Sequence, residues 1–338
     1  MIDTSWLKIS KPGLYVIPAF AHIDPVRAVD TAIITHGHAD HARAGHGHVI
    51  ATPETLAIMS ARYGSNFAGR QTALPYNQHF TLGDVSVKLI PAGHVLGSAQ
   101  IVLEYANTKI IAAGDYKRRS DPTCRPFQVE QCDVFITEAT FGLPVFAHPE
   151  PETQIKKLLE IQHLFPKRSI LIAAYSLGKA QRLIALLREA DYDETIFIHG
   201  AMKKLCELYT SFGIELGRLQ TTPIGKIDNQ QISLANKFIL APPSAMGTKW
   251  AQRLCDPLVV SASGWMQVRQ RAKKGGVELP LVISDHADWN DILRTIKEVN
   301  ASEIWVTHGR EDALIHVCSQ MGLSAKALSL IGYEDESE

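Results

Sequence analysis

The stretch that decides the fold reads His36-Gly37-His38-Ala39-Asp40-His41, a His-x-His-x-Asp-His signature. It follows the apolar run Ala32-Ile33-Ile34, closed by Thr35, and this order predicts a buried strand that leads into a loop. Three imidazoles and one carboxylate lie within six residues, a density that the binding of two neighbouring transition-metal ions would explain. Each imidazole can offer one neutral nitrogen to a metal while nearby groups hold its other N–H. The stretch therefore predicts a metal site.

The composition is that of an ordinary globular protein. The chain has 338 residues, 46% hydrophobic and 20% charged, which is enough for one large domain or two modest ones. A formal net charge of -1 predicts no polyanion partner for the molecule as a whole, so any nucleic-acid surface must be a local basic patch. Five scattered cysteines without a CxxC pair indicate reduced thiols, and neither a long apolar run nor a secretory pattern is evident. We expect a cytoplasmic protein without a membrane partner.

The apolar runs predict a first part rich in β-strands. Thr52-Pro53-Glu54 predicts a capped helix start with a proline at its first position, and Gly64 predicts the end of that helix. The expected strands are 32–35, 49–52, 85–90, 100–105, 109–114 and 134–138.

From about residue 148, helices and strands are expected to alternate, as in a small parallel α/β sheet. The helices are expected at 154–164, 178–190, 203–212, 289–299 and 313–321, and the strands at 170–174, 195–199, 281–284 and 304–307. We interpret the chain as one αββα-type metal domain of residues 1–147 and 277–338, interrupted by an inserted α/β cap of residues 148–276. The acidic residues 334–338 are expected to form a disordered tail.

Further residues of metal-binding types stand at the carboxyl ends of predicted strands. Two-layer sheets gather their active sites there, although a single histidine at such a place more often caps a strand or forms a hydrogen bond. The same placement found five times is hard to reach by chance. The five residues are His94, Asp115, Glu138, His286 and His308.

With these motifs the chain resembles the metallo-β-lactamase superfamily and, within it, the β-CASP nucleases, over nearly its whole length. The superfamily's first four motifs match Asp24 in His22-Ile23-Asp24-Pro25, residues 36–41, His94 and Asp115. The β-CASP motifs match Glu138 in Thr137-Glu138-Ala139-Thr140-Phe141-Gly142, then His286 and His308. Superfamily hydrolases without a cap lack these last three residues in this context. The resemblance implies a metallo-β-lactamase αββα sandwich with an inserted β-CASP α/β cap, and a nuclease activity.

Two stretches favour one branch of these nucleases. Ser284-Asp285-His286-Ala287-Asp288-Trp289 and Pro242-Pro243-Ser244-Ala245-Met246-Gly247 look most like bacterial ligase-associated DNA exonucleases, which implies a role in DNA repair. A histidine at position 308 is more typical of RNA-processing members, since the Artemis-type repair branch usually carries an aliphatic residue there. An RNA-processing nuclease of the same fold is therefore the alternative, and a small-molecule ester or thioester hydrolase is the third possibility.

The resemblance also implies a ligand set for two divalent ions, zinc or manganese. His36, His38 and His94 would bind one ion, Asp40, His41 and His308 the other, and Asp115 would bridge them. Hydroxide would attack the phosphodiester, and His286 would stabilise charge on the phosphoryl oxygens. Asp24 and Glu138 would orient ligand histidines and, with Asp40 and His286, complete the catalytic set.

Substrate contacts are expected at two places. Lys117-Arg118-Arg119 and Ser98 belong to the loops of the metal site, which would anchor them beside the substrate. Tyr175, Ser176 and Lys179 lie where a predicted strand meets a helix N-terminus, whose free N–H groups attract anions. The expected partner is nucleic acid, DNA rather than RNA, and a DNA ligase or helicase is implied by family association alone.

Overall fold

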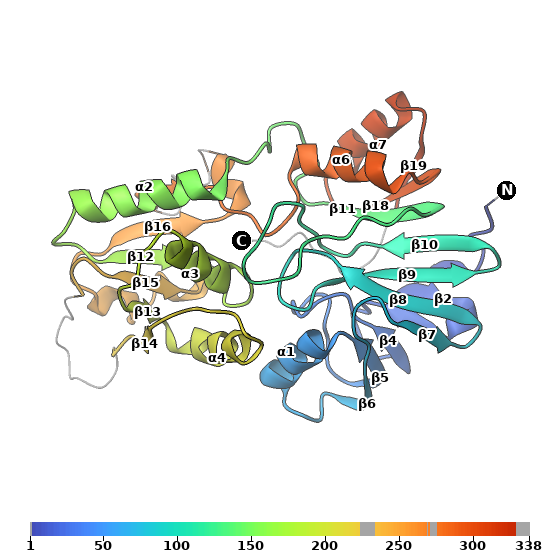
Figure 1. The fold of residues 1–338 in the computed structure, drawn as a ribbon, viewed down its shortest axis with the longest axis horizontal. Helices are drawn as coiled ribbons and strands as arrows, with labels where there is room; N and C mark the ends of the chain where they lie inside the picture. Colours follow the sequence, from blue (N-terminus) through green and yellow to red (C-terminus); the bar gives the residue numbers. More distant parts are fainter. Residues whose placement is uncertain (1, 224–233, 269, 271–275, 329–338) are drawn as a thin grey trace. The chain divides into compact units, whose positions relative to one another are not determined.

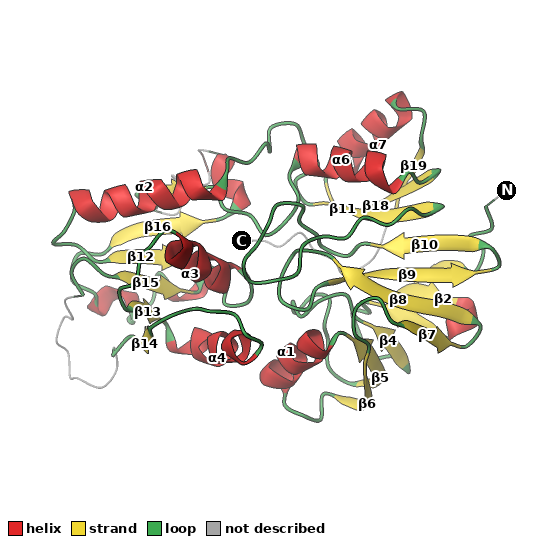
Figure 2. Cartoon of the chain, in the orientation of Figure 1, coloured by secondary structure: helices red, strands yellow, loops and turns green. Residues whose placement is uncertain are grey.

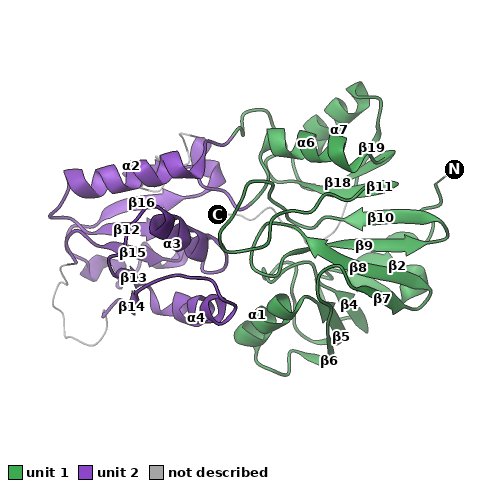
Figure 3. Ribbon diagram, in the orientation of Figure 1, with its two compact units in different colours: residues 1–147, 286–337 green, residues 148–285, 338 purple. Residues whose placement is uncertain are grey.

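The protein divides into two compact units in a computed structural model that describes residues 2–223, 234–268, 270 and 276–328 (Figure 1). Unit 1 comprises residues 1–147 and 286–337, and unit 2 comprises residues 148–285 (Figure 3). The expected acidic tail 334–338 lies outside the described residues.

Unit 1 contains two sheets in its described part. The first has the strand order β1-β2-β3-β4-β5-β6, antiparallel from β1 to β3 and parallel from β3 to β6. Its strands are β1 (Leu7–Ser10), β2 (Gly13–Val16), β3 (Ala21–Ile23), β4 (Thr31–Ile33), β5 (His46–Ala51) and β6 (Ala68–Ala73).

The second sheet has the order β19-β18-β11-β10-β9-β8-β7. Antiparallel pairing joins β7, β8, β9 and β10, and parallel pairing joins β10, β11, β18 and β19. The strands β8, β10, β11 and β18 therefore run in one direction and end at the same edge of the sheet. The strands are β7 (His79–Leu82), β8 (Val85–Pro91), β9 (Ala99–Tyr105), β10 (Thr108–Ala112), β11 (Val134–Ala139), β18 (Glu303–Gly309) and β19 (Ser324–Ala327).

Three apolar clusters stack these sheets and their helices into layers. One cluster joins the two sheets and contains Ile33 and Ile110. Along β10 the next residue, Ile111, points to the other face and packs with α6 (Trp289–Val299) and α7 (Glu311–Gln320). A third cluster joins the first sheet to α1 (Pro53–Tyr63). The order α1, sheet, sheet, α6 with α7 is the expected αββα sandwich (Figure 2).

Local signals explain where the unit 1 helices begin and end. The Thr52 hydroxyl accepts a hydrogen bond from the backbone N–H of Thr55 and caps α1. The Asp288 carboxylate accepts from the backbone N–H of Asp291 and caps α6. Helix α6 ends at Asn300, whose φ of 50° is the left-handed conformation typical of helix ends.

Unit 2 is built on a parallel sheet with the order β14-β13-β15-β12-β16-β17. Its strands β12 (Ile170–Ala173), β13 (Ile196–Ile198) and β15 (Phe238–Ala241) are buried and lie next to one another in the sheet. The other elements are β14 (Leu219–Thr221), β16 (Leu258–Ala262), β17 (Leu279–Leu281), α2 (Pro151–Leu164), α3 (Lys179–Glu189) and α4 (Lys203–Ser211).

The second boundary of unit 2 lies beyond the residue 276 expected from sequence. Strand β17 pairs in parallel with β16, so the chain stays in unit 2 until Asp285. The expected strand 281–284 was therefore wrong, because strand β17 already ends at Leu281.

Five short 3-10 helices lie among the described residues: η1 (Ile17–Ala19), η2 (Gly200–Met202), η3 (Pro243–Ala245), η4 (Ala251–Arg253) and η5 (Gly264–Gln267). Across the described residues, every helix is too short or too polar to span a bilayer.

Candidate metal centre

The predicted ligands stand at the ends of strands in both sheets of unit 1. From the first sheet, Asp24 follows β3 and residues 36–41 follow β4. From the second, the strands that end at one edge carry His94 after β8, Asp115 after β10, Glu138 near the end of β11 and His308 near the end of β18. His286 precedes α6. Packing the two sheets face to face therefore gathers residues that lie far apart in the sequence.

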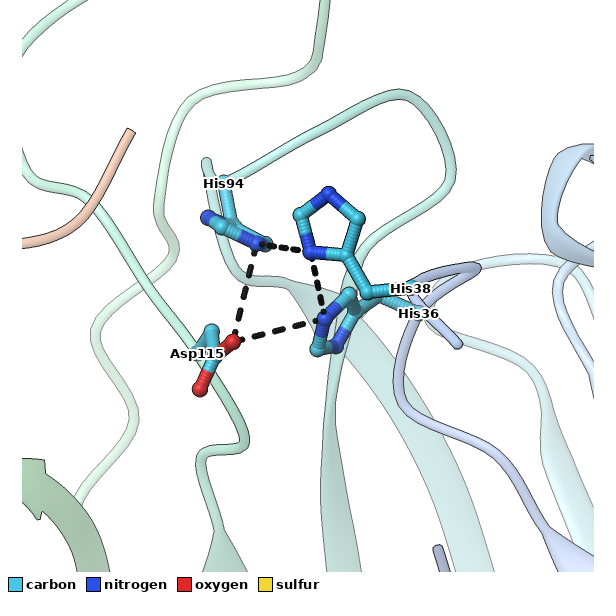
Figure 4. A group of neighbouring side chains, drawn as sticks. All are labelled: His36, His38, His94 and Asp115. Carbon is cyan, nitrogen blue, oxygen red and sulfur yellow. Dashed lines mark hydrogen bonds and ion pairs between the residues drawn. The ribbon is translucent and has the colours of Figure 1, made fainter. Parts of the chain in front are cut away.

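Four of these residues form a compact group in the interior (Figure 4). His38 Nδ1 lies 3.1 Å from His36 Nε2 and 3.0 Å from His94 Nε2. Asp115 Oδ2 lies 3.4 Å from His36 Nε2 and 3.7 Å from His94 Nε2. His36, His94 and Asp115 are buried, and His38 is partly exposed.

The spacing of these four atoms fits a tetrahedral metal ion. Ligand atoms placed 2.0–2.1 Å from a tetrahedral zinc ion would be about 3.4 Å from one another. The four distances that join the group run from 3.0 to 3.7 Å and scatter around that value. Three imidazole nitrogens and one carboxylate oxygen are also the donor set that zinc and similar ions prefer. The residues present therefore fit a divalent metal.

His41 lies near the same oxygen of the Asp115 carboxylate, and its ring is 4.2 Å from that of His36. Its Nδ1 is 2.8 Å from Asp24 Oδ2, so its Nε2 faces Asp40 and Asp115, with 3.6 Å to an oxygen of each. The ring of His308 lies 5.4 Å from that of His41. Asp115 Oδ2 thus lies within 3.7 Å of imidazole nitrogens from both predicted ligand sets.

The charges of the site favour a bound cation. Burial lowers the pKa of His41, but Asp115, Asp24 and Asp40 outweigh it and raise that pKa to about 10. Burial, followed by the neighbouring histidines, holds the pKa of His36 well below its ordinary value, so His36 is a neutral donor. Burial raises the pKa of Asp115 to about 7. Carboxylates that hold a proton on a buried imidazole would equally stabilise a dication in its place.

Glu138 and His286 form a second hydrogen-bonded pair. Glu138 Oε2 lies 2.8 Å from His286 Nδ1, and Glu138 Oε1 accepts the backbone N–H of Tyr116 at 2.7 Å. The His286 ring lies 4.7 Å from that of His94. Glu138 and His286, together with Asp115, are near enough to one another to form a further candidate ligand group among the described residues.

Relatives of known name match this chain along much of its length. A protein of Opitutus terrae named probable DNA ligase is 26% identical over 94% of the chain, which spans 30% of that protein. Endoribonuclease ysh-1 of Neurospora crassa is 30% identical over 52% of the chain, or 25% of its own length. An RNase J-like protein of Methanocaldococcus jannaschii is 24% identical over 84% of the chain and 82% of its own length. The resemblance to the β-CASP nucleases of the metallo-β-lactamase superfamily is confirmed.

The expected fold class, a metallo-β-lactamase sandwich with a β-CASP cap, is confirmed as well. A crystal structure from Enterococcus faecalis V583, of a protein of unknown function, is similar at a TM-score of 0.59 and 16% identity, over 90% of this chain and 80% of that one. No protein-family model matches the chain. The chain spans less than a third of the length of the Opitutus terrae and Neurospora crassa relatives.

In unit 1, the residues that were expected to contact the substrate are bonded to other groups of the protein or are buried. Ser98 is buried, and its hydroxyl accepts the backbone N–H groups of His94 and Val95, so it shapes the His94 loop. Lys117 is buried. Arg118 and Arg119 form ion pairs with Glu298 and Asp288, respectively, on and next to α6.

The contacts expected in unit 2 lie at the start of α3. Tyr175 and Ser176 are partly exposed, and Lys179 is buried with its Nζ 3.5 Å from Asp285 Oδ2 and 5.6 Å from the centre of the Tyr175 ring. Gln181 accepts the backbone N–H of Gly178 and donates to the Ser176 carbonyl, which closes the first turn of α3. Contact of these residues with a substrate stays a prediction.

Sequence reasoning missed Thr35 as part of the site. Its Oγ1 donates to Asp24 Oδ2 at 2.5 Å and lies 3.0 Å from His36 Nδ1, while its backbone N–H donates to Asp24 Oδ1 at 2.8 Å. Thr35 thus connects the carboxylate that orients His41 with the ring of His36. The position of a hydroxyl directly before the signature was the one available signal.

Proposed function

We propose that this chain is a metal-dependent nuclease that hydrolyses phosphodiester bonds at the cluster around Asp115. One observation carries the proposal: Asp115 Oδ2 lies 3.4–3.7 Å from the Nε2 atoms of His36, His41 and His94. A carboxylate in that position can bridge two ions. Relatives whose names describe them as endoribonuclease, RNase J-like protein and DNA ligase support a nucleic-acid substrate.

The proposed ligands are those expected from the resemblance. His36, His38 and His94 would hold one ion, Asp40, His41 and His308 would hold the other, and Asp115 would be a ligand shared by both. Two divalent ions, zinc or manganese, would supply a hydroxide at neutral pH and charge to oppose that of the phosphoryl oxygens.

The other polar residues hold these groups in place. Asp24 accepts from His41 Nδ1, which leaves Nε2 for the metal. Glu138 orients His286 in the same way, by binding its Nδ1. The Nε2 of His286 can then donate to a phosphoryl oxygen as negative charge develops there.

We propose DNA as the substrate and exonucleolytic repair as the role. The Opitutus terrae relative named probable DNA ligase aligns with 94% of this chain, which supports a link with DNA ends and with a ligase partner. In this proposal Lys117, Arg118, Ser98, Tyr175, Ser176 and Lys179 contribute to substrate binding. The guanidinium of Arg119, which was also expected there, is paired with Asp288.

RNA processing is the second candidate, favoured by different relatives. The fungal endoribonuclease and the archaeal RNase J-like protein are named for action on RNA. The histidine at position 308, in place of an aliphatic residue, points in the same direction.

The test uses end-labelled single-stranded DNA and RNA of one sequence with the purified protein and Mn²⁺ or Zn²⁺. Asp40→Ala and His38→Ala each remove a ligand, so we expect cleavage to be abolished while the far-UV spectrum stays that of the wild type. His79→Ala is the matched control, because His79 is exposed on β7 and bonded to Ser86. Stepwise shortening of DNA supports a repair exonuclease, and cleavage of RNA alone supports the second candidate.

An active, metal-loaded Asp40→Ala or His38→Ala protein would contradict the ligand assignment. If the wild type cleaves neither polymer but hydrolyses a small-molecule ester or thioester, the proposal of a nuclease is wrong and the third possibility replaces it.

A further inference from the structure

Two loops of the metal centre are tied together by contacts that the proposed chemistry does not use. We call residues 115–119, which begin with the bridging Asp115, the Asp115 loop, and residues 286–288 the His286 loop. The backbone N–H of Ala287 donates to the carbonyl of Tyr116 at 2.7 Å. The backbone N–H of Tyr116 in turn donates to Glu138, which binds His286. The position of the His286 ring therefore depends on the Asp115 loop.

An ion pair also joins the Asp115 loop to the His286 loop. Arg119 Nη2 lies 3.0 Å from Asp288 Oδ2, and Arg119 Nε lies 3.9 Å from Asp291 Oδ2. The Asp288 side chain is only 2% exposed, whereas that of Arg119 is 25% exposed. A carboxylate so well buried needs a charged partner, which makes Arg119 costly to remove.

The two carboxylate oxygens of Asp288 bind different groups. Oδ2 binds Arg119, and Oδ1 accepts the backbone N–H of Asp291 and caps α6. The same carboxylate therefore caps α6 and pairs with the Asp115 loop, two residues after His286 in the chain. Arg118 strengthens the attachment, since it donates to Thr295 at 3.0 Å and to Glu298 at 2.5 Å on the same helix.

We propose that Arg119 and Asp288 are positioning residues that act as one unit to hold His286 against Asp115. The inference rests on the proposed nuclease function. It gives Arg119 a task different from the phosphate contact that its basic charge suggests. A phosphate contact would act through Arg119 alone, whereas a positioning pair must need both partners.

The two roles differ in which kinetic constant changes. Loss of a phosphate contact weakens substrate binding and raises KM, and lysine would largely restore the charge. Loss of the pair displaces His286 and lowers kcat, and lysine does not restore it because its single ammonium cannot reproduce the guanidinium geometry towards Asp288 and Asp291. Asp288→Asn separates the tasks of the carboxylate, since asparagine caps helices as well as aspartate does.

The experiment compares Arg119→Gln, Arg119→Lys, Asp288→Asn and the Arg119→Gln/Asp288→Asn double variant with the wild type. Arg294→Gln is the matched control, because Arg294 lies on the solvent side of α6 and pairs with Glu298. For each protein, kcat, KM, bound metal and the thermal unfolding midpoint are measured. In ¹⁵N-histidine-labelled protein, the His286 side-chain signal, assigned with a His286→Gln variant, reports the ring directly.

We expect each single variant to lower kcat about tenfold or more, with KM and metal content unchanged, as for other groups that support a metal site. The double variant should lose no more than either single variant, since the partners act as one unit. The His286 signal should shift in all four variants and stay in place in Arg294→Gln.

Three results would overturn the inference. One is a raised KM with unchanged kcat in Arg119→Gln, especially with recovery in Arg119→Lys. The second is additive losses in the double variant, and the third is a His286 signal that stays in place. Lack of cleavage by the wild type would instead refute the proposed function, and the positioning role would fall with it.

Discussion

Thr35 illustrates how a single hydroxyl can determine the arrangement of a metal centre. It donates to the Asp24 carboxylate, and that carboxylate binds His41 Nδ1 at 2.8 Å. The same Oγ1 lies 3.0 Å from His36 Nδ1. Two predicted ligands, one for each ion, are thus oriented through one buried side chain.

Thr35→Val, which keeps the shape and removes the hydroxyl, tests this arrangement. Groups that orient metal ligands typically change metal affinity by about 10–100-fold, so we expect a loss of that size. Competition with a chromophoric chelator measures it. Thr35→Ser is the control and should retain wild-type affinity; a valine variant that binds as tightly as the serine variant would exclude the role.

Residue types and spacing were enough to predict which side chains gather, but not how they are bonded. His36, His38, His94 and Asp115 lie together, and so do Asp115, Glu138 and His286. Except for His286, which precedes α6, these residues lie at or near the ends of strands. The contacts of Thr35, and the partners of Arg118 and Arg119 near α6, depend on which strands and helices become neighbours. A single sequence holds no direct record of those pairings.

At the scale of elements, α1 and the His94 loop support each other. The Gly97 carbonyl accepts from Thr52 Oγ1 at 2.7 Å and from Thr55 Oγ1 at 3.0 Å. Gly97 has a φ of +79°, and a Cβ there would lie 2.7 Å from the backbone nitrogen of Thr55. The start of α1 therefore rests on the loop that carries His94, and only glycine allows the approach.

Thr52→Ala should lower the free energy of unfolding by about 1–3 kcal/mol, since it removes the α1 cap and one bond to a buried carbonyl. Urea unfolding of the metal-free protein measures the change without a contribution from bound ions. Thr52→Ser keeps the hydroxyl and serves as the control. Equal stability of the alanine and wild-type proteins would show that α1 does not depend on this cap.

Local signals in the sequence located some elements well and failed to locate others. Helix 289–299 was predicted residue for residue, because its cap, its apolar spacing and its end are all explicit. Among the missed strands, β6 and β7 are short or polar and have no fully buried residue, but β15 and β16 were missed although they are apolar. Strand β17 was placed too late because its pairing with β16, and not its hydrophobicity, defines it.

At the scale of the molecule, alternation of strands and helices predicted two units and the order of their parts. The αββα layering of unit 1 follows from strands with apolar residues on both faces, as in β9 and β10, which must be covered on both sides. The end of unit 2 at Asp285 could not be read from the sequence, because it depends on the pairing of one short strand.

Removal of metal should destabilise the whole protein. A ligand at about 100 times its Kd adds about 2.7 kcal/mol of stability. For a unit of 150–250 residues this corresponds to about 5–10 °C in Tm. We therefore expect calorimetry to show a loss of that size after treatment with a chelator, and a much smaller loss in Asp115→Asn, which lacks the shared carboxylate. Equal losses in both proteins would place the metal elsewhere.

The most direct measurement titrates the metal-free protein with Mn²⁺ or Zn²⁺ and follows bound metal and nucleic-acid cleavage in the same samples. We predict that cleavage is absent without metal and rises to its maximum as the content approaches two ions per chain. In Asp115→Asn neither should reach the wild-type level. Cleavage by the metal-free protein, or full metal loading without cleavage of DNA or RNA, would contradict the account.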